Sequence, residues 1–225
     1  MRNLPAPLHP QVVAFLDGMP ANTSGTIDNI SVAEFREQFD KIITSQTTEN
    51  IKVQRVSLIS IPGPDSNINA RIYYPNFYKR TERSTSPLIV YFHGGGHVVG
   101  NLDSHDSVAR RLCAEFESII ASIDYRLAPE HKFPAAIEDS YAATKWLAVN
   151  AEKLGADTNE LSVAGDSAGG NIAAVVAIMA RDDIQGPRIK FQLLLYPVTD
   201  YSCKSNSYQI YGSGFGGLTA QRMLW

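Results

Sequence analysis

Two kinds of hydrophobic pattern divide the chain near residue 50. Before this point, apolar side chains recur at helical spacing, which predicts helices near Pro10–Met19 and Val32–Thr44. After it, short apolar runs alternate with longer amphipathic segments. The short runs predict strands at Ile51–Ile61, Ile68–Tyr74, Leu88–Phe92, Ile119–Ile123, Leu161–Ala164 and Phe191–Tyr196. The longer segments predict helices at Ser104–Phe116 and Ala135–Leu154, with Gly155 as a C-terminal cap, and at Ala168–Arg181, which is apolar nearly all round and is expected to be buried.

The alternation of strands and helices from residue 88 onward predicts an α/β fold. Crossover connections of this kind produce a mostly parallel central sheet with helices on both faces. The two earlier strands flank the turn Pro62–Asp65 and are expected to pair antiparallel. We therefore expect an N-terminal helical cap or lid segment, residues 1–48, and an α/β core, residues 49–225.

Composition narrows the functional class. The chain has 225 residues, 44% of them apolar, which is enough for one α/β domain with a sizeable core. Twenty basic and 23 acidic residues give a net charge of −3, and no basic patch points to nucleic acid. No apolar run approaches the ~20 residues of a membrane span, and prolines interrupt the N-terminal segment where a secretion signal needs an apolar core. Cys113 and Cys203 predict no disulfide framework or zinc cluster and favour a cytoplasmic protein.

A serine stands at a strand–helix junction in VAGDSAGGN, residues 163–171. A serine hydroxyl attacks only from an exposed position, with a base and with donors for the developing oxyanion. A sharp turn would lift Ser167 clear of the sheet, and such a turn needs small neighbours, here Gly165 and Gly169. The amide of Ala168 opens the helix and can point at an oxyanion. Ser167 is the candidate nucleophile; the alternative is a glycine-rich turn with an incidental serine.

A second glycine-rich segment, YFHGGGHVVG, follows the first buried strand at residues 91–100. Consecutive glycines let the backbone turn several N–H groups toward one point. Gly94, Gly95 and Gly96 are predicted to form an oxyanion hole together with Ala168, with Gly94 shaping the loop and His93 anchoring it by hydrogen bonds. A phosphate loop is disfavoured because no G-K-[ST] follows. A flexible glycine hinge is the remaining alternative.

Several segments together resemble the hormone-sensitive-lipase-like branch of the α/β-hydrolases, the microbial carboxylesterases with an HGGG loop. They are HGGGHVVGNLDSHD at 93–106, DYRLAPEHKFPAAIED at 124–139, GDSAGGN at 165–171, LLLYPVTD at 193–200 and GSGFGGLT at 212–219. The resemblance covers roughly residues 50–225 and implies an α/β-hydrolase fold. It also implies hydrolysis of short- to medium-chain carboxylic esters through a serine acyl-enzyme, with a small-molecule ester as partner and no cofactor or metal.

Residue roles follow from the same resemblance. Ser167 resembles the nucleophile, and Asp166 resembles a supporting residue of the turn. Tyr125, Arg126, Pro129 and Glu130 resemble a structural segment that braces the site. His97 is a departure, because the family usually has an apolar residue there. The family often pairs through an edge strand that is not expected in this sequence, so a homodimer stays open, and no stable membrane insertion is expected.

The resemblance implies a triad in the order Ser…Asp…His, with the last two residues on loops after the final strands. The sequence ends at Trp225, so we expect those strands and both residues to be absent and Phe191–Tyr196 to lie at a sheet edge. None of the five histidines matches the base position; His97 is the least remote, and a His93–His97 metal pair lacks further ligands. Two functions stay open: a serine carboxylesterase, and a non-catalytic ligand-binding or inactive truncated member.

Overall fold

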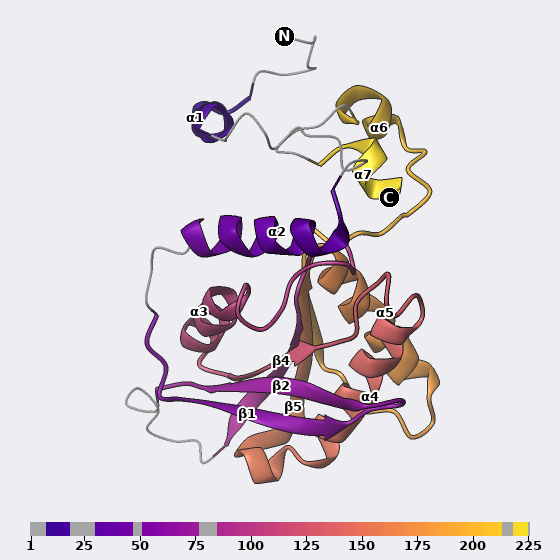
Figure 1. Cartoon of the computed structure of the whole chain (residues 1–225). Coiled ribbons are helices and arrows are strands. Elements are labelled where there is room, and N and C mark those ends of the chain that lie inside the picture. The colour runs from indigo at the N-terminus through magenta and orange to yellow at the C-terminus, as the bar shows by residue number, and fades with distance from the viewer. Residues whose placement is uncertain (1–7, 19–29, 47–50, 77–84, 213–217, 225) are drawn as a thin grey trace. The chain divides into compact units, whose positions relative to one another are not determined.

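The computed structural model of the chain describes residues 8–18, 30–46, 51–76, 85–212 and 218–224 (Figure 1). These residues separate into two compact units. One spans residues 32–198 and is called the core unit here. The other takes the described parts of 1–31 and 199–225, with helices α1 (Pro10–Asp17), α6 (Asn206–Tyr211) and α7 (Ala220–Leu224). The predicted boundary between residues 48 and 49 stays a prediction.

The core unit is built on one sheet, whose described strands follow the order β1-β2-β4-β3-β5-β6. The strands are β1 (Arg55–Pro62), β2 (Asn67–Tyr74), β3 (Ser86–Phe92), β4 (Ile119–Asp124), β5 (Ala156–Asp166) and β6 (Phe191–Leu195). β2 is antiparallel to β1 and β4, whereas β3 is parallel to β4 and β5, and β5 is parallel to β6. The predicted mostly parallel sheet with an antiparallel first pair is confirmed, and β6 lies at the edge of the described sheet.

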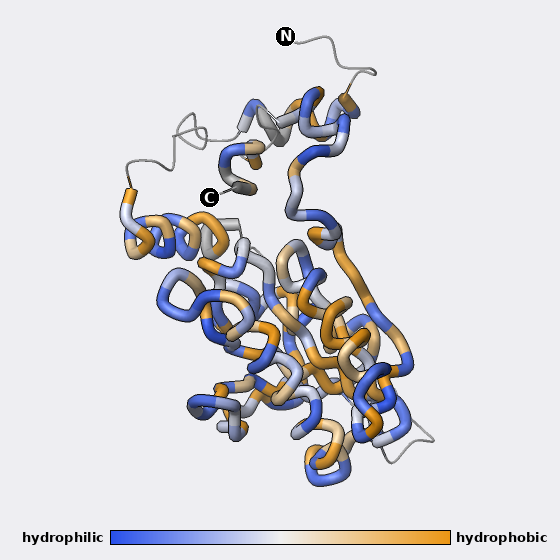
Figure 2. The backbone as a smooth tube through the Cα atoms, turned by 90° about the vertical axis from the view of Figure 1, so that its right-hand side faces the viewer, coloured by the Kyte–Doolittle hydropathy of each residue, from blue (hydrophilic) through white to orange (hydrophobic). Residues whose placement is uncertain are grey.

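Helices cover both faces of this sheet, as predicted. Side chains alternate across a strand, so Leu88, Val90 and Phe92 point to one face and Tyr91 points to the other. The first face packs on α4 (Ala135–Val149) and α5 (Ala168–Asp182), and the second packs on α3 (Asp106–Phe116). Figure 2 shows the apolar segments concentrated along the strands inside the core unit. A fourth helix, α2 (Val32–Gln46), also belongs to this unit.

Helix α4 ends earlier than the predicted Leu154. Both the backbone N–H and the side-chain amide of Asn150 donate to the carbonyl of Trp146, at 3.0 and 2.9 Å. An asparagine that competes in this way for backbone groups favours a helix end. A short 3₁₀ turn, Glu152–Leu154, follows. Gly155 then caps it with φ +76°, the left-handed conformation that the sequence predicted for this position.

Helix α3 begins two residues later than predicted, at Asp106. The side-chain oxygen of Asn101 accepts the amide hydrogens of Asp103 and Ser104, at 2.9 and 2.8 Å. This local turn uses amides that a longer helix would need. The predicted residues Met19 and 213–217 lie outside the described part of the chain. Among the described residues, none of the helices has the length and apolar character needed to cross a membrane.

Candidate active site

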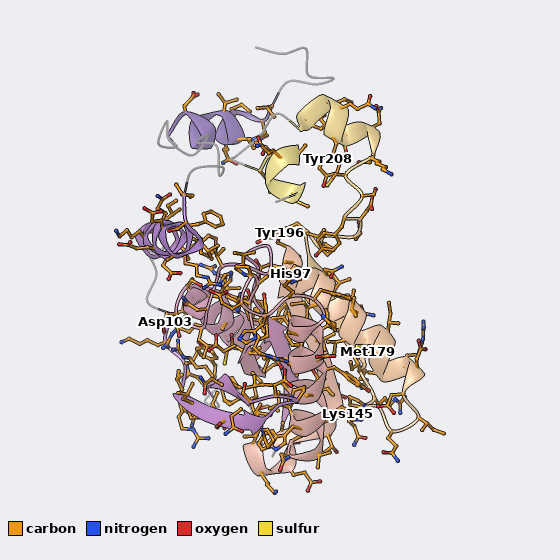
Figure 3. The ribbon with its side chains drawn as sticks, turned by 45° about the vertical axis from the view of Figure 1, so that its right-hand side comes forward. His97, Asp103, Lys145, Met179, Tyr196 and Tyr208 are labelled. Carbon is orange, nitrogen blue, oxygen red and sulfur yellow. The ribbon has the colours of Figure 1, made fainter. Side chains whose placement is uncertain are left out.

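The two glycine-rich segments lie at the carboxyl ends of neighbouring strands of the sheet. β3 and β5 are parallel neighbours, with Phe92 opposite Gly165. The glycine loop, residues 93–100, follows β3. The elbow, residues 165–169, spans the end of β5 and the start of α5. The carboxyl ends of adjacent parallel strands are where α/β folds place their binding sites. In Figure 3, His97 on the glycine loop and Tyr196 after β6 lie at this end of the core unit.

Ser167 occupies a strained backbone position between β5 and α5. Its φ of +52° and ψ of −117° are unfavourable for a residue with a side chain, so the surrounding structure must hold it there. Three backbone hydrogen bonds do so: Ser167 N–H donates to Leu195 O at 2.9 Å, and Ser167 O accepts from Asn171 and Val198 at 3.1 Å each. The side chain is partly exposed. The predicted sharp turn is therefore present.

The glycines of the elbow are required by close backbone contacts. A Cβ at Gly165 would collide with the carbonyl of Gly169, inside the first turn of α5. A Cβ at Gly169 would collide with the carbonyls of Phe92 and His93, at the end of β3. Glycine is the residue that permits such approaches. The start of α5 can therefore lie directly against both the elbow and the glycine loop.

Hydrogen bonds orient the peptide planes of the glycine loop. His93 Nδ1 lies 2.8 Å from Gly94 O, and Gly95 O accepts from the amides of Val98 and Val99 at 3.0 Å each. In a trans peptide, the carbonyl and the following N–H point in opposite directions. The Gly95 N–H therefore points away from the His93 ring, and the Gly96 N–H points away from the turn at Val98.

The amides of Gly95, Gly96 and Ala168 have no protein acceptor within the described residues. Ala168 is the first residue of α5, so its N–H has no partner within the helix. Gly94 differs, because its N–H donates to Asp166 Oδ1 at 2.9 Å. Gly94 thus offers no free amide hydrogen, which leaves Gly95, Gly96 and Ala168 as the candidate donors.

Asp166 joins the elbow to the glycine loop. Its Oδ1 accepts from the Gly94 amide and from Tyr91 Oη, the latter at 2.6 Å, and its Oδ2 lies 3.7 Å from His105 Nε2. Burial raises the pKa of Asp166, but His105 and Tyr91 outweigh that effect and leave the pKa below its ordinary value. Asp166 is therefore a buried carboxylate that holds the two loops together.

His93 and His105 lie side by side in the interior. The His93 ring is fully buried and stacks on Tyr125, with 4.4 Å between centroids. Burial and the neighbouring His105 lower the pKa of His93 to about 4, so it is neutral at pH 7. His105, which the sequence placed in the helix predicted at Ser104–Phe116, is also buried, with an exposed fraction of 6%. Its spacing from Ala109 and Leu112 matches the buried face of α3 and would have indicated this position.

The described histidines do not reach the Ser167 hydroxyl. His93 and His105 direct their rings at Gly94 and at Asp166, and Ser167 Oγ has no hydrogen-bond partner among the described residues. His97 sits on the glycine loop with φ +64°, and burial lowers its pKa.

The chain is similar to several known esterases. A family profile described as "alpha/beta hydrolase fold" matches residues 89–225. Esterase LipI of Mycobacterium tuberculosis is 51% identical over 145 residues, which is 64% of this chain and 44% of LipI. Ethyl acetate hydrolase of Pseudomonas putida is 35% identical over 227 residues, which is 97% of this chain and 69% of that enzyme.

A solved structure agrees with these relatives. The hyperthermophilic esterase from the archaeon Pyrobaculum calidifontis superposes with a TM-score of 0.84 at 41% identity, over 98% of this chain and 69% of that one. The chain thus spans less than half of LipI and about two thirds of the other two proteins. The chain belongs to the hormone-sensitive-lipase-like carboxylesterase family of the α/β-hydrolases.

Proposed function

We propose that this chain carries the nucleophile and the oxyanion hole of a serine carboxylesterase that acts on short- to medium-chain esters. The observation that carries the proposal is the strained position of Ser167 beside the acceptor-free amides of Gly95, Gly96 and Ala168. A hydroxyl lifted on a sharp strand–helix turn next to unpaired N–H groups is the arrangement that acyl transfer requires. The names of the relatives, among them an ethyl acetate hydrolase, support the choice of substrate class.

In the proposed reaction, Ser167 Oγ attacks the ester carbonyl carbon while its proton passes to a base. The carbonyl oxygen becomes an oxyanion, which accepts hydrogen bonds from the three free amides. The tetrahedral intermediate then collapses. The bond to the alcohol oxygen breaks, that oxygen takes the proton from the base, and an acyl-serine remains. Water then attacks the acyl-serine and releases the acid. The family resemblance implies an aspartate-held histidine as the base, and no residue of this sequence is proposed for that role.

The test is hydrolysis of 4-nitrophenyl butyrate by the 225-residue chain. Ser167→Ala removes the nucleophile, so the release of nitrophenol is expected to fall to the background rate. Ser60→Ala, on the exposed side of β1, is a matched control and should leave the rate unchanged. Nitrophenol release by Ser167→Ala at the rate of the unsubstituted chain would contradict the proposal.

A non-catalytic ligand-binding protein is the second candidate, and one observation favours it. Ser167 Oγ lacks a base among the described residues, and without triad partners only ~10³–10⁴ of rate enhancement over water survives. Saturable binding of the butyrate ester, measured by calorimetry with no nitrophenol released, would support this candidate. A cytoplasmic location and a homodimer stay predictions, to be checked by fractionation and by analytical ultracentrifugation.

A further inference from the structure

Helix α2 contacts the glycine loop through side chains one helical turn apart. Arg36 Nε donates to Val98 O at 2.8 Å. One turn later, Asp40 accepts from the side-chain amide of Asn101, at 3.3 and 3.2 Å to its two oxygens. Between them, Phe39 stacks on His105 with 6.3 Å between ring centroids. One face of α2 therefore lies along the loop from Val98 to Asn101.

The Arg36 guanidinium also binds a third segment, residues 128–130. It donates to Ala128 O at 3.0 Å and makes a two-pronged contact with the Glu130 carboxylate, at 2.9 and 2.7 Å. This contact holds the pKa of Glu130 at about 2. The same segment touches the glycine loop directly, because Ala128 N–H donates to His97 O at 2.9 Å. One side chain thus joins α2, the glycine loop and residues 128–130.

The part of the loop that Arg36 holds is the part that orients the free amides. Val98 N–H donates to Gly95 O, and that bond sets the plane of the peptide that carries the Gly96 N–H. Gly95, Gly96 and His97 all have positive φ, so no helix or strand ladder fixes this stretch. A planar fork that binds two carbonyls and a carboxylate at once can fix it, whereas a lysine ammonium offers no such geometry.

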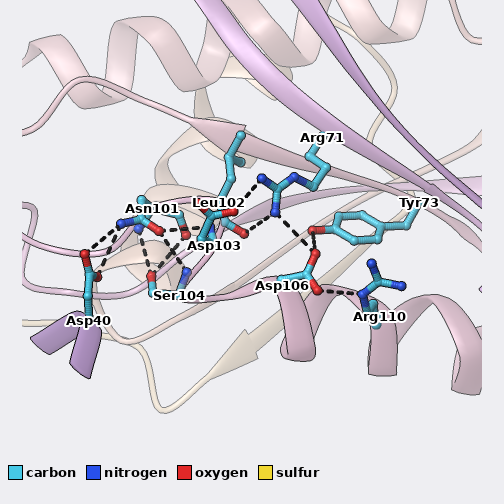
Figure 4. Close-up of polar contacts among 9 residues, drawn as sticks. All are labelled: Asp40, Arg71, Tyr73, Asn101, Leu102, Asp103, Ser104, Asp106 and Arg110. Atoms are coloured by element: carbon cyan, nitrogen blue, oxygen red, sulfur yellow. Dashed lines mark hydrogen bonds and ion pairs between the residues drawn. The ribbon is translucent and has the colours of Figure 1, made fainter. Parts of the chain in front are cut away.

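The second contact of α2 falls on a segment that is already held from elsewhere. Asn101 begins the turn before α3, and Asp103 of that turn pairs with Arg71 on β2 (Figure 4). Asp106, at the start of α3, accepts from Tyr73 Oη at 2.7 Å and from Arg110. Because this network ties residues 101–106 to β2 without α2, removal of Asp40 should matter less than removal of Arg36.

We propose that Arg36 is a positioning residue for ester hydrolysis: through Val98 and residues 128–130, it holds the amides of Gly95 and Gly96 where the oxyanion forms. The inference rests on the proposed function. It gives α2 a role in ordering the oxyanion hole, beyond the cap or lid expected for residues 1–48.

The experiment compares Arg36→Ala and Arg36→Lys with Lys41→Ala in the 225-residue chain. Lys41 lies on the same helix in an exposed pair with Glu37, so it controls for general effects on α2. The first measurement is amide hydrogen exchange of residues 95–99, with β4 as an internal reference. Both Arg36 variants should exchange roughly tenfold faster there, because local opening no longer breaks the contacts to Val98 and Ala128. Lys41→Ala should match the unsubstituted chain.

The second measurement is the split between kcat and KM for 4-nitrophenyl butyrate. Misplaced donors weaken transition-state binding, so kcat should fall roughly 10- to 100-fold while KM changes less than about twofold. Asp40→Ala should lower kcat less than Arg36→Ala does. Where Arg36→Ala fails to fold, as seen in its thermal transition, Arg36→Lys and Glu130→Gln provide the same comparison with helix and charge largely kept.

The outcomes test the role of Arg36 separately from the proposed ester hydrolysis. Unchanged exchange at residues 95–99 in the folded Arg36 variants overturns the inference, and so does faster exchange with unchanged kcat. If the unsubstituted chain hydrolyses no ester, ester hydrolysis by the 225-residue chain itself fails, and the exchange data alone then decide whether Arg36 orders the loop.

Discussion

The elbow and the glycine loop lie at the same sheet edge but are held by different means. The elbow is fixed by backbone contacts: Ser167 is tied to Leu195 and Val198, and Gly169 lies against the carbonyl ends of β3. The glycine loop also has backbone hydrogen bonds, from Val98 and Val99 to Gly95 O and from Ala128 to His97 O, but side chains hold it from four further directions. These are His93 within the loop, Asp166 from the elbow, Arg36 from α2 and Tyr125 after β4, whose hydroxyl donates to His93 O at 2.6 Å.

Because of this difference, the elbow and the glycine loop are expected to tolerate different substitutions. In the elbow, a single added methyl group meets backbone atoms that cannot move without shifting a strand or a helix. In the glycine loop, a Cβ at Gly94, Gly95 or Gly100 would also collide with its neighbours, but a Cβ at Gly96 would meet open space. Polar side chains that can be changed one at a time contribute to the conformation of this loop. Substitutions at the elbow glycines should therefore act through folding, whereas a substitution at Gly96, or of a side chain that holds the loop, should act through the placement of the loop amides.

The largest effect is expected in the elbow, from Gly169→Ala. The added methyl group would overlap the carbonyls of Phe92 and His93, so α5 would have to move away from β3. Overpacking of this kind should lower the free energy of unfolding by about 3 kcal/mol or more. Urea unfolding measures it, with Ala173→Gly in the same helix as a comparison that adds no atoms. A Gly169→Ala protein of unchanged stability would show that the elbow is not fixed by its backbone contacts.

The next effect concerns the stability of the protein at acid pH, which depends on His93 in the glycine loop. His93 has a pKa of about 4 when folded and about 6.5 when unfolded, so between these values the unfolded chain binds more protons. The free energy of unfolding should therefore fall as the pH drops from 6.5 to about 4, by about 3 kcal/mol in total from this residue. Above pH 6.5 the residue contributes no slope.

His93→Asn tests this pH dependence. An asparagine amide can still donate to Gly94 O but does not titrate. Urea unfolding at pH 7, 5.5 and 4.5 should show a shallower loss of stability for His93→Asn than for the unsubstituted chain. Equal losses for the two proteins would mean that the buried histidine is not kept neutral by the fold.

Local patterns in the sequence were sufficient to predict the elbow. The apolar run before Gly165, the small residues around Ser167 and the helical spacing after Ala168 are all properties of consecutive residues, and each predicted element is present. The same holds for Gly155, whose place after an amphipathic segment predicted its left-handed conformation.

The supports of the glycine loop were not predictable in the same way. Arg36 and Val98 are 62 residues apart, and Tyr91 and Asp166 are 75 apart, so their contacts depend on the packing of separate elements. Gly94 illustrates the consequence. It was predicted to shape the loop, but the carboxylate that accepts its amide hydrogen comes from another strand, which no local pattern indicates.

A smaller effect should come from Tyr91→Phe, which removes one hydrogen bond from the buried Asp166 carboxylate. The bond is 2.6 Å long, and hydrogen bonds to charged groups contribute about 2 kcal/mol. Tyr74→Phe is the matched control, because the Tyr74 hydroxyl makes no hydrogen bond among the described residues and its ring is also buried. Thermal unfolding should show a clear loss for Tyr91→Phe and little change for Tyr74→Phe. Equal losses would indicate that ring packing, and not the link to Asp166, explains the effect.

The smallest effect on stability, and the sharpest contrast between stability and placement, is expected from Gly96→Ala. Gly96 has φ +61° with open space where a Cβ would lie, and Gly155 has φ +76° with the same open space. Alanine in this conformation costs roughly 1–2 kcal/mol, so Gly96→Ala and Gly155→Ala should lower the free energy of unfolding by similar amounts.

Of these two glycines, only Gly96 carries an amide that is assigned to the oxyanion. Its new methyl group would stand beside that amide, so kcat for 4-nitrophenyl butyrate should fall at least tenfold in Gly96→Ala and stay unchanged in Gly155→Ala. A loss of kcat shared by both variants would trace it to general destabilisation, and a loss in neither would remove Gly96 from the proposed oxyanion hole.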